Sequence, residues 1–376
     1  MLTNTGNLIK PLQKCARIEG TDKSFFCLDK ILTYNKPWNF ITGPRSCGKT
    51  TAVAIFLLLD FLYNGHMFIY TRRTKDELDI TKTKFFGDAV KILNSKLNLG
   101  IEYVTMNGFD YYIKMVGENQ EEQLCGTSYY ISKEEKLKSG GIFVYNAVYD
   151  EFISQDSTGY LGTLEAPKEY EKVLELYATL DRGVNTPYRN EVRFFFLGNT
   201  ATIYNPIFTE LNVVQYIQET SKIISPKSEA WLLQQLSIDD VRALEDYKNS
   251  FLYSLSNERQ RDYNFNNKGR DDNTFIERKP DNARPIFTLK VQARPYGVYL
   301  LDGIFYLARA QFATKTEVFA LDVNSHDGII DREYVHRYGG NQYVKTIMEA
   351  YTQGRLRFDN GTTKNTFMKY FGFLPR

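Results

Sequence analysis

The chain has 376 residues, and its 47 lysines and arginines against 45 aspartates and glutamates give a formal net charge of +2. This length favours two domains over one, and the shares of hydrophobic (43%) and charged (24%) residues exclude a disordered or fibrous protein. The near-neutral balance also excludes a protein that coats nucleic acid by bulk charge. Any contact with nucleic acid must therefore depend on a few local positions.

The cysteines give no sign of a disulfide framework or a zinc site. Cys15, Cys27, Cys47 and Cys125 form no CxxC pair, and we expect them to be reduced thiols. The longest apolar run, residues 52–59, is far shorter than the ~20 residues of a membrane-spanning helix. The N-terminus lacks a secretory signal pattern. These features predict a soluble intracellular protein with no membrane partner.

Strand and helix patterns alternate over the first 200 residues, which predicts an α/β sheet. The predicted strands are residues 38–42, 67–71, 142–149 and 193–197, and the predicted helices are 50–63, 76–96 and 167–180. Residues 101–106 and 111–116 flank the dipeptide Asn107-Gly108. Asn-Gly is typical of a type I′ turn, because both residues accept a positive φ, so we expect a hairpin here.

The second half of the chain changes character twice. Residues 205–256 are mostly helical in pattern, most clearly over 238–247, and residues 257–284 lose apolar periodicity and gain Asn, Asp, Lys and Arg, as linkers do. Beyond them a second hairpin is predicted around Asp302-Gly303, and residues 317–323 form a further strand. We expect an α/β domain over 1–210, a helical lid and polar linker over 211–284, and a small α+β domain over 285–376.

The most specific motif is the run Gly43-Pro44-Arg45-Ser46-Cys47-Gly48-Lys49-Thr50, which matches the Walker A pattern G-x4-G-K-[ST]. A predicted strand enters it and an apolar helix leaves it, so that backbone N–H groups and the helix N-terminus face a phosphate. We expect Lys49 to reach the β and γ phosphates, the Thr50 hydroxyl to bind Mg²⁺, and Thr51 to complete the binding set. Arg45 either leans over the triphosphate or is solvated.

Two carboxylates follow the apolar strand at 142–149. Asp150 is expected to hold the Mg²⁺ shell, and Glu151 to polarise the attacking water, which a hydrolase needs and a kinase does not. The chain has no Asn-Lys-x-Asp motif, which favours ATP over GTP. The next strand ends in Asn199-Thr200, where Asn199 is the first candidate for sensing the γ-phosphate, although a turn-forming Asn is nearly as good an interpretation.

These residues resemble a known family. Arg45 within the loop, the stretch Tyr70-Thr71-Arg72-Arg73-Thr74-Lys75 and the run Leu137-Lys138-Ser139 resemble terminase large subunits. The length and the short C-terminal part are most similar to the phi-29-type DNA-packaging ATPases, the encapsidation proteins of small tailed phages. The resemblance covers about residues 30–210, and beyond them it depends only on size and element order.

The resemblance implies a P-loop ATPase of the ASCE class, which hydrolyses ATP to push double-stranded DNA into a viral procapsid. It implies a ring of five subunits at the portal vertex in the host cytoplasm, with portal and procapsid as partners and, where the phage has one, a structural packaging RNA. It also implies an arginine finger supplied in trans. We expect Arg182 in this role, with Arg189 and Arg193 as alternatives, and a surface arginine is an equally good interpretation of Arg182 alone.

The resemblance also suggests where DNA is contacted and what the C-terminal domain has lost. Lys133, Lys136 and Lys138 fit a pore loop that contacts DNA phosphates, although a solvated charged loop explains them as well, and Arg72 and Arg73 are similarly ambiguous. An RNase H-like nuclease needs several inward carboxylates to hold two metals. Asp302 is in a hairpin turn, and Asp322 and Asp327 lie near one strand end with no clear acidic partners. We therefore expect a vestigial domain without nuclease activity.

Two other functions remain open at this point. A cellular translocase or helicase of the HerA/FtsK type has the same core motifs. A nucleotide-dependent scaffold that binds ATP without turnover is the alternative outside the motor class, and Glu151 argues against it.

Overall fold

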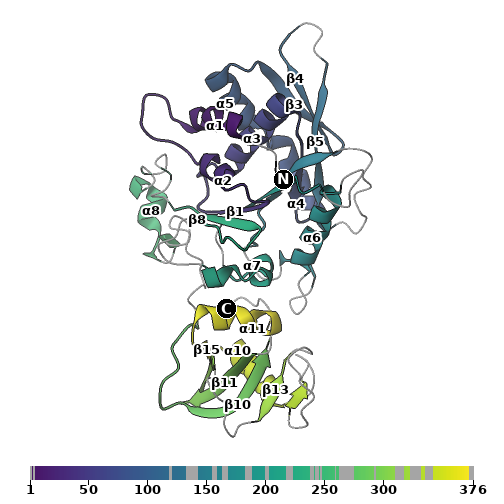
Figure 1. Ribbon diagram of the computed structural model, residues 1–376. Coiled ribbons are helices and arrows are strands. Elements are labelled where there is room, and N and C mark those ends of the chain that lie inside the picture. The colour runs from purple at the N-terminus through teal and green to yellow at the C-terminus, as the bar shows by residue number, and fades with distance from the viewer. Residues whose placement is uncertain are drawn as a thin grey trace. The chain divides into compact units, whose positions relative to one another are not determined.

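The computed structural model describes residue 2 and residues 5–117, 121–132, 143–154, 159–162, 168–182, 189–199, 203–216, 223–237, 241, 245, 248–258, 260–261, 275–291, 294–309, 317–321, 332–334 and 342–371. The chain divides into two compact units (Figure 1). The first comprises Met1–Gln155, Glu169–Ala201 and Gln218–Arg270, and the second comprises Asp156–Lys168, Thr202–Ile217 and Asp271–Arg376. The expected lid and linker over 211–284 is therefore divided between the two units.

A nine-stranded sheet forms the centre of the first unit, in the order β3-β4-β5-β2-β6-β7-β1-β9-β8. Its strands are β1 (Trp38–Thr42), β2 (Met67–Arg72), β3 (Ile101–Asn107), β4 (Asp110–Met115), β5 (Gln123–Tyr130), β6 (Val144–Asp150), β7 (Arg193–Gly198), β8 (Ile223–Ile224) and β9 (Trp231–Gln235). The strands from β5 through β9 run parallel, and antiparallel pairs close both edges. Strand β7 lies between β1 and β6, which is the additional strand that the ASCE class requires.

Side chains of the central strands alternate between the two faces of this sheet, and both faces are buried. The helices of the unit are α1 (Ile9–Ala16), α2 (Asp29–Tyr34), α3 (Lys49–Asn64), α4 (Lys75–Thr81), α5 (Gly87–Leu97), α6 (Glu169–Leu180) and α8 (Phe251–Leu255), with short 3-10 segments η1 (Gly6–Leu8) and η2 (Lys82–Lys84). Helices α1, α3 and α5 pack together on one face (Figure 1), where the Phe56 ring lies 5.3 Å from that of Phe195. On the other face Trp38 packs against Phe196 and against Tyr177 of α6.

The register of three parallel strands brings the candidate site residues to one edge. Thr42, the last residue of β1, pairs with Gly198 at the end of β7. On the other side of β7, Leu197 pairs with Asp150, the last residue of β6. Because the carboxyl ends of parallel strands meet at one edge, the loop after β1, the acids after β6 and Asn199 after β7 are neighbours.

The predicted core elements of the first 200 residues are confirmed, with two differences in detail. The helical pattern over 76–96 is two helices, α4 and α5, separated by η2 and a turn at Phe85-Phe86. The hairpin at 101–116 forms, but Asn107 pairs with Asp110, so the turn residues are Gly108 and Phe109. Only Gly108 has a positive φ (64°), as a type II′ turn requires, so the expected type I′ turn is wrong.

The mostly helical pattern expected over 205–256 is also wrong in part. The apolar run Trp231-Leu232-Leu233 lies in β9, which pairs with β1 in the parallel sheet. Of the predicted helix over 238–247, only residues 241 and 245 lie among the described residues. The periodicity of a short apolar run does not distinguish a buried strand from a buried helix. Here the run is a strand because it pairs with the edge of β1 that β7 leaves open.

The second unit is a six-stranded sheet in the order β14-β13-β10-β11-β12-β15 with helices packed on it. Its elements are α7 (Pro206–Glu210), η4 (Val213–Tyr216), β10 (Arg284–Val291), β11 (Arg294–Leu301), β12 (Ile304–Arg309), β13 (Val318–Ala320), β14 (Arg332–Tyr334), α10 (Gln342–Thr352), β15 (Leu356–Phe358) and α11 (Gly361–Phe371). Three antiparallel strands, β12-β11-β10, continue into two parallel ones, β13-β14, as expected of an RNase H-like sheet. The hairpin at Asp302-Gly303 is confirmed, and both turn residues have a positive φ (47° and 79°).

The structure also describes the cysteines and the apolar character of the helices. All four cysteines are free, and burial raises the pKa of Cys15 to about 11 and that of Cys27 to about 12. Within the described parts of the chain, no helix combines the length and the apolar character that crossing a membrane demands.

A buried carboxylate ties the C-terminal turn of α3 to β6, and its loss should destabilise the first unit. Asp60 is fully buried and accepts hydrogen bonds from Asn146 and Asn64, both at 2.6 Å, and contacts His66 at 3.1 Å. Asp60→Ala leaves the buried Asn146 amide without this acceptor. We expect the free energy of unfolding to fall by about 3 kcal/mol, measured by urea denaturation.

Tryptophan fluorescence reports on this unit, because Trp38 and Trp231 both lie in it. The control is Asp79→Ala, which removes an exposed ion pair with Lys82 and should leave the urea midpoint unchanged. Equal midpoints for Asp60→Ala and the wild type would show that this buried cluster does not stabilise the fold.

Candidate active site

The phosphate loop follows β1 directly and is shaped by two backbone requirements. Gly48, the residue before α3, has a φ of 89°, and Ser46 has a φ of 64°, so the chain turns back over the start of the helix. Gly43 cannot carry a side chain, because a Cβ there would lie 2.7 Å from the Cβ of Leu236. The Phe26 N–H donates to the Cys47 carbonyl at 3.1 Å, which fixes the loop from the N-terminal side.

Lys49 is the first residue of α3, and its ammonium lies inside the loop. The side chain is only 7% exposed. Its Nζ donates to the carbonyl oxygens of Gly43 (2.9 Å) and Pro44 (2.6 Å) and to Oδ1 of Asn199 (3.2 Å). Burial lowers the pKa of Lys49 from its usual value. An ammonium held by neutral acceptors gains strongly from a phosphate, which offers a charged acceptor in the same place.

The two acids at the carboxyl end of β6 are placed differently. Asp150 is buried, and burial raises the pKa of its carboxyl above the usual value, although Arg72 opposes the shift. The Tyr70 hydroxyl donates to Asp150 Oδ2 at 3.1 Å. The side chain of Glu151 is 55% exposed, and its Oε2 lies 3.1 Å from Nη1 of Arg72. One acid is thus fixed inside the site, and the other projects from its rim.

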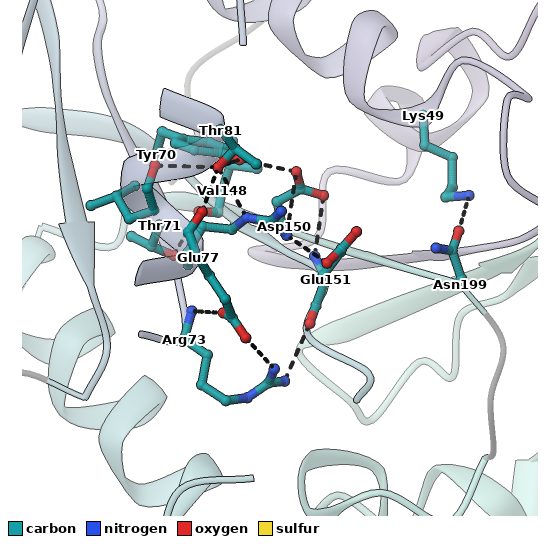
Figure 2. Close-up of polar contacts among 12 residues, drawn as sticks. Lys49, Tyr70, Thr71, Arg73, Glu77, Thr81, Val148, Asp150, Glu151 and Asn199 are labelled. Atoms are coloured by element: carbon teal, nitrogen blue, oxygen red, sulfur yellow. Dashed lines mark hydrogen bonds and ion pairs between the residues drawn. The ribbon is translucent and has the colours of Figure 1, made fainter. Parts of the chain in front are cut away.

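The loop, the acids and Asn199 border one cavity of about 700 Å³. Arg45, Thr50 and Thr51 also line it. Away from the loop much of its wall is apolar and comes from the N-terminal part of the chain and from Ile92 of α5, with Leu12, Ala16 and Phe25 among its residues, while Asp88 and Lys91 of α5 add charged groups. A polar end with a buried lysine and an apolar end suit a ligand with phosphates at one end and a flat base at the other. Figure 2 shows Lys49 and Asn199 directed toward each other, beside the acidic pair.

The residues present fit a magnesium ion. Thr50 and Asp150 line the same cavity and offer oxygen atoms only, and Mg²⁺ typically takes one or two protein oxygens and keeps its remaining ligands from water and phosphate. Among the described residues, no group of three or more His, Cys, Asp or Glu side chains could hold a metal.

The three candidate fingers are placed very differently. Arg182 follows the last turn of α6 and is exposed. Arg193 is 2% exposed, donates to Asn35 at 3.2 Å and lies over the Phe56 ring. Arg189 is half-buried, and its Nη2 donates to the carbonyls of Val144 (2.7 Å) and Leu180 (2.8 Å). Neither alternative can extend toward another subunit in this conformation, so Arg182 is the candidate that the geometry favours.

Several predicted residues lie outside the described part of the chain. They are the possible DNA-contacting residues Lys133, Lys136 and Lys138, the second sensor candidate Thr200, and the C-terminal aspartates Asp322 and Asp327. Asp302 is described, and its position in a hairpin turn agrees with a structural role.

Sequence reasoning missed some contributors to the site. The apolar wall from Leu12, Ala16 and Phe25 precedes the loop by about 20 to 30 residues and matches no motif. The sequence predicts no role for Tyr70 beyond its place in the family resemblance, yet its hydroxyl contacts Asp150. The strand alternation of β2 could have found it, because Tyr70 lies two residues from its carboxyl end.

The burial of Asp150 predicts that this acid destabilises the protein without ligand. Because the folded state raises its pKa, the folded protein binds a proton more tightly than the unfolded chain does, and stability falls as the pH rises through that pKa. Asp150→Asn should raise the Tm at pH 7.5 by about 2–4 °C while abolishing turnover, and the gain should shrink as the pH is lowered. Calorimetry at a series of pH values checks this, and a lower Tm for Asp150→Asn at pH 7.5 would contradict it.

Comparison with known proteins identifies the family. The family model described as Podovirus DNA encapsidation protein (Gp16) matches residues 21–373. The DNA packaging proteins of Bacillus phages phi29 and PZA are each 26% identical to this chain over 359 residues, covering 93% of it and 98% of the relative. A solved structure, the bacteriophage Phi-29 viral genome packaging motor assembly, has a TM-score of 0.64 at 24% identity and covers 92% of this chain and 98% of its own. The resemblance inferred from the motifs is thereby confirmed, and the chain belongs to the podovirus DNA encapsidation protein (Gp16) family, whose members package viral DNA.

Proposed function

We propose that this chain is the ATPase subunit that drives double-stranded DNA into a procapsid. The observation that carries the proposal is that Asp150 and Glu151 border the same cavity as the phosphate loop. A protein that only binds nucleotide needs the loop and one acid, whereas a hydrolase also needs a group that activates water. Because the chain belongs to a DNA encapsidation family, we propose that this hydrolysis drives DNA packaging.

The loop residues bind and orient the triphosphate. Lys49 exchanges its contacts with the Gly43 and Pro44 carbonyls for phosphate oxygens. Asn199 contacts Lys49 at 3.2 Å and lies at the end of the neighbouring strand β7, so it is placed to respond when the γ-phosphate arrives or leaves. The apolar wall at the other end of the cavity is suited to an adenine ring. These contacts support ATP as the substrate.

Thr50 and Asp150 would hold Mg²⁺, which neutralises phosphate charge when it is bound. Tyr70 donates to one oxygen of Asp150 and Arg72 lies 3.9 Å from it, so the carboxylate is kept in one orientation. Glu151 is the group that takes a proton from the attacking water. Its ion pair with Arg72 fixes the direction of its side chain at the rim of the cavity.

The exposed position of Arg182 supports a ring arrangement. It is exposed beyond α6, so it is placed to reach a neighbouring subunit, where an arginine finger raises the rate about 10³–10⁵-fold by neutralising charge on the departing phosphate. The similarity to a packaging motor assembly supports a ring. We propose five subunits that act transiently at the portal vertex in the host cytoplasm, with DNA, the portal and, where the phage has one, a packaging RNA as partners.

The alternatives are weaker. A cellular HerA/FtsK-like translocase does not fit the family match over residues 21–373. A scaffold without turnover leaves the placement of Glu151 beside the cavity unexplained.

The test of the proposed function is protection of DNA from nuclease inside procapsids. Purified chain, portal-bearing procapsids, DNA and ATP should give protected full-length DNA, and a non-hydrolysable ATP analogue should give none. Protection that is equal with ATP and with the analogue would show that hydrolysis does not drive packaging.

Glu151→Gln should separate binding from chemistry. Loss of a general base lowers the rate about 10²–10⁴-fold, so we expect ATP turnover to fall at least 100-fold while ATP affinity stays within about twofold of the wild type, because the loop is intact. Steady-state hydrolysis and a fluorescent-nucleotide titration measure the two quantities. Glu175→Gln, on the exposed side of α6, is the matched control and should behave as wild type. Unchanged turnover for Glu151→Gln would overturn the assignment.

Mixed subunits test whether Arg182 acts in trans. Arg182→Ala subunits have an intact loop but supply no finger, and Lys49→Ala subunits supply a finger but cannot use ATP. Each variant alone should be nearly inactive, and their mixture should regain part of the wild-type rate. A mixture with Lys49→Ala/Arg182→Ala subunits is the control and should regain none. Equal rates in the two mixtures would contradict a finger in trans.

A further inference from the structure

The backbone at Glu151 adopts a conformation that a residue with a side chain avoids. Its φ is 56°, in the left-handed region. Such a conformation persists only where the surrounding contacts hold it. The Glu151 N–H donates to Oδ1 of Asp150 at 3.1 Å, which fixes one side of this peptide. The contacts on its carbonyl side come from a different part of the chain.

Those carbonyl contacts belong to Arg73, the residue directly after β2. Its Nη2 donates to the carbonyl of Phe152 at 2.8 Å and to that of Glu151 at 3.2 Å. Figure 2 shows the guanidinium reaching this segment from the end of the strand. One group therefore contacts two successive carbonyls at the point where the chain leaves the acidic pair.

Arg73 is in turn held by a buried acid. Its Nε donates to Oε1 of Glu169 at 3.0 Å, and the Tyr149 hydroxyl donates to the same oxygen. Arg73 is 3% exposed and Glu169 is fully buried. Glu77 completes the surroundings, with an oxygen 3.6 Å from Nη1 of Arg73.

A buried ion pair contributes little net stability compared with apolar residues of the same volume, so stability alone does not explain this cluster. The geometry of arginine does, because its planar guanidinium holds donors in a fixed fork that spans from the Glu169 carboxylate to the two carbonyls, and the compact ammonium of a lysine lacks that fork. We propose that Arg73, held by Glu169 and Tyr149, is a positioning residue that keeps Glu151 in its working orientation, an inference that rests on the hydrolytic role proposed for Glu151.

The two neighbouring arginines then have separate tasks. Arg72 contacts the side chain of Glu151, at 3.1 Å, and so acts on its charge. The contacts of Arg73 with this residue are to its backbone carbonyl, so it acts on where the carboxylate points. Misplacement of a reacting group by about 1 Å costs up to about 100-fold in rate without a matching loss of binding.

The experiment compares Arg73→Lys with Arg193→Lys, a control that removes a guanidinium equally buried in the same sheet but away from the cavity. Single-turnover ATP hydrolysis, ATP affinity and Tm are measured for both. For Arg73→Lys we expect the rate to fall about 10- to 100-fold with affinity within about twofold. Arg193→Lys should lose thermal stability with a rate within about twofold of the wild type. Equal rates for the two variants would overturn the proposal.

A double variant separates positioning from a general structural effect. If Arg73 acts through Glu151, adding Arg73→Lys to Glu151→Gln should change the remaining rate by less than about twofold, because the group being positioned is already lost. A further tenfold loss would overturn the positioning role. If Glu151→Gln alone left turnover unchanged, the role of Glu151 and this inference would both fail.

Where Arg73→Lys does not fold, Tyr149→Phe replaces it in the same cycle. This change removes one donor to Glu169 and leaves Arg73 in place, so we expect a smaller loss of rate, about three- to tenfold, again absent in the Glu151→Gln background. A wild-type rate for a folded Tyr149→Phe would contradict the arrangement.

Discussion

The parallel register of β6, β7 and β1 is the constraint on which the rest of this molecule depends. It pairs Thr42 with Gly198 and Asp150 with Leu197, so the phosphate loop, the acidic pair and Asn199 lie at the same edge of the sheet. A shift of one residue in β7 would move Asn199 away from Lys49 and would exchange the two buried faces of the strand. The aromatic packing of both faces therefore fixes the geometry of the site as well as the fold.

This edge carries an unusual amount of buried charge. Lys49, Arg72, Arg73, Asp150 and Glu169 are all nearly inaccessible to solvent. Burying such groups is costly unless each finds a partner, and here partners of opposite charge or backbone carbonyls satisfy most of them. Burial raises the pKa of Asp150 although Arg72 lies beside it, so its surroundings disfavour the charged form of this carboxyl. A site of this kind is less stable than an apolar core and is ready to receive phosphate and metal charges.

The local parts of this site could be predicted from the sequence, and the long-range parts could not. The loop at 43–50 and the acids Asp150 and Glu151 each follow a buried strand, so their signals lie within a few residues. Arg73 and Glu169 are 96 residues apart and match no motif, so only the folded sheet brings them together. The finger candidates show the same limit, because Arg182 and Arg193 look alike in sequence, and burial separates them.

A motor must hold and release DNA in each cycle, and a formal net charge of +2 is compatible with few, local DNA contacts. The most direct test of this function is the rate of ATP hydrolysis by the purified chain with DNA, measured with and without portal-bearing procapsids. We predict that DNA raises the rate and that procapsids raise it further, because the complete ring then forms at the portal. A DNA-stimulated rate that procapsids leave unchanged would contradict a packaging motor.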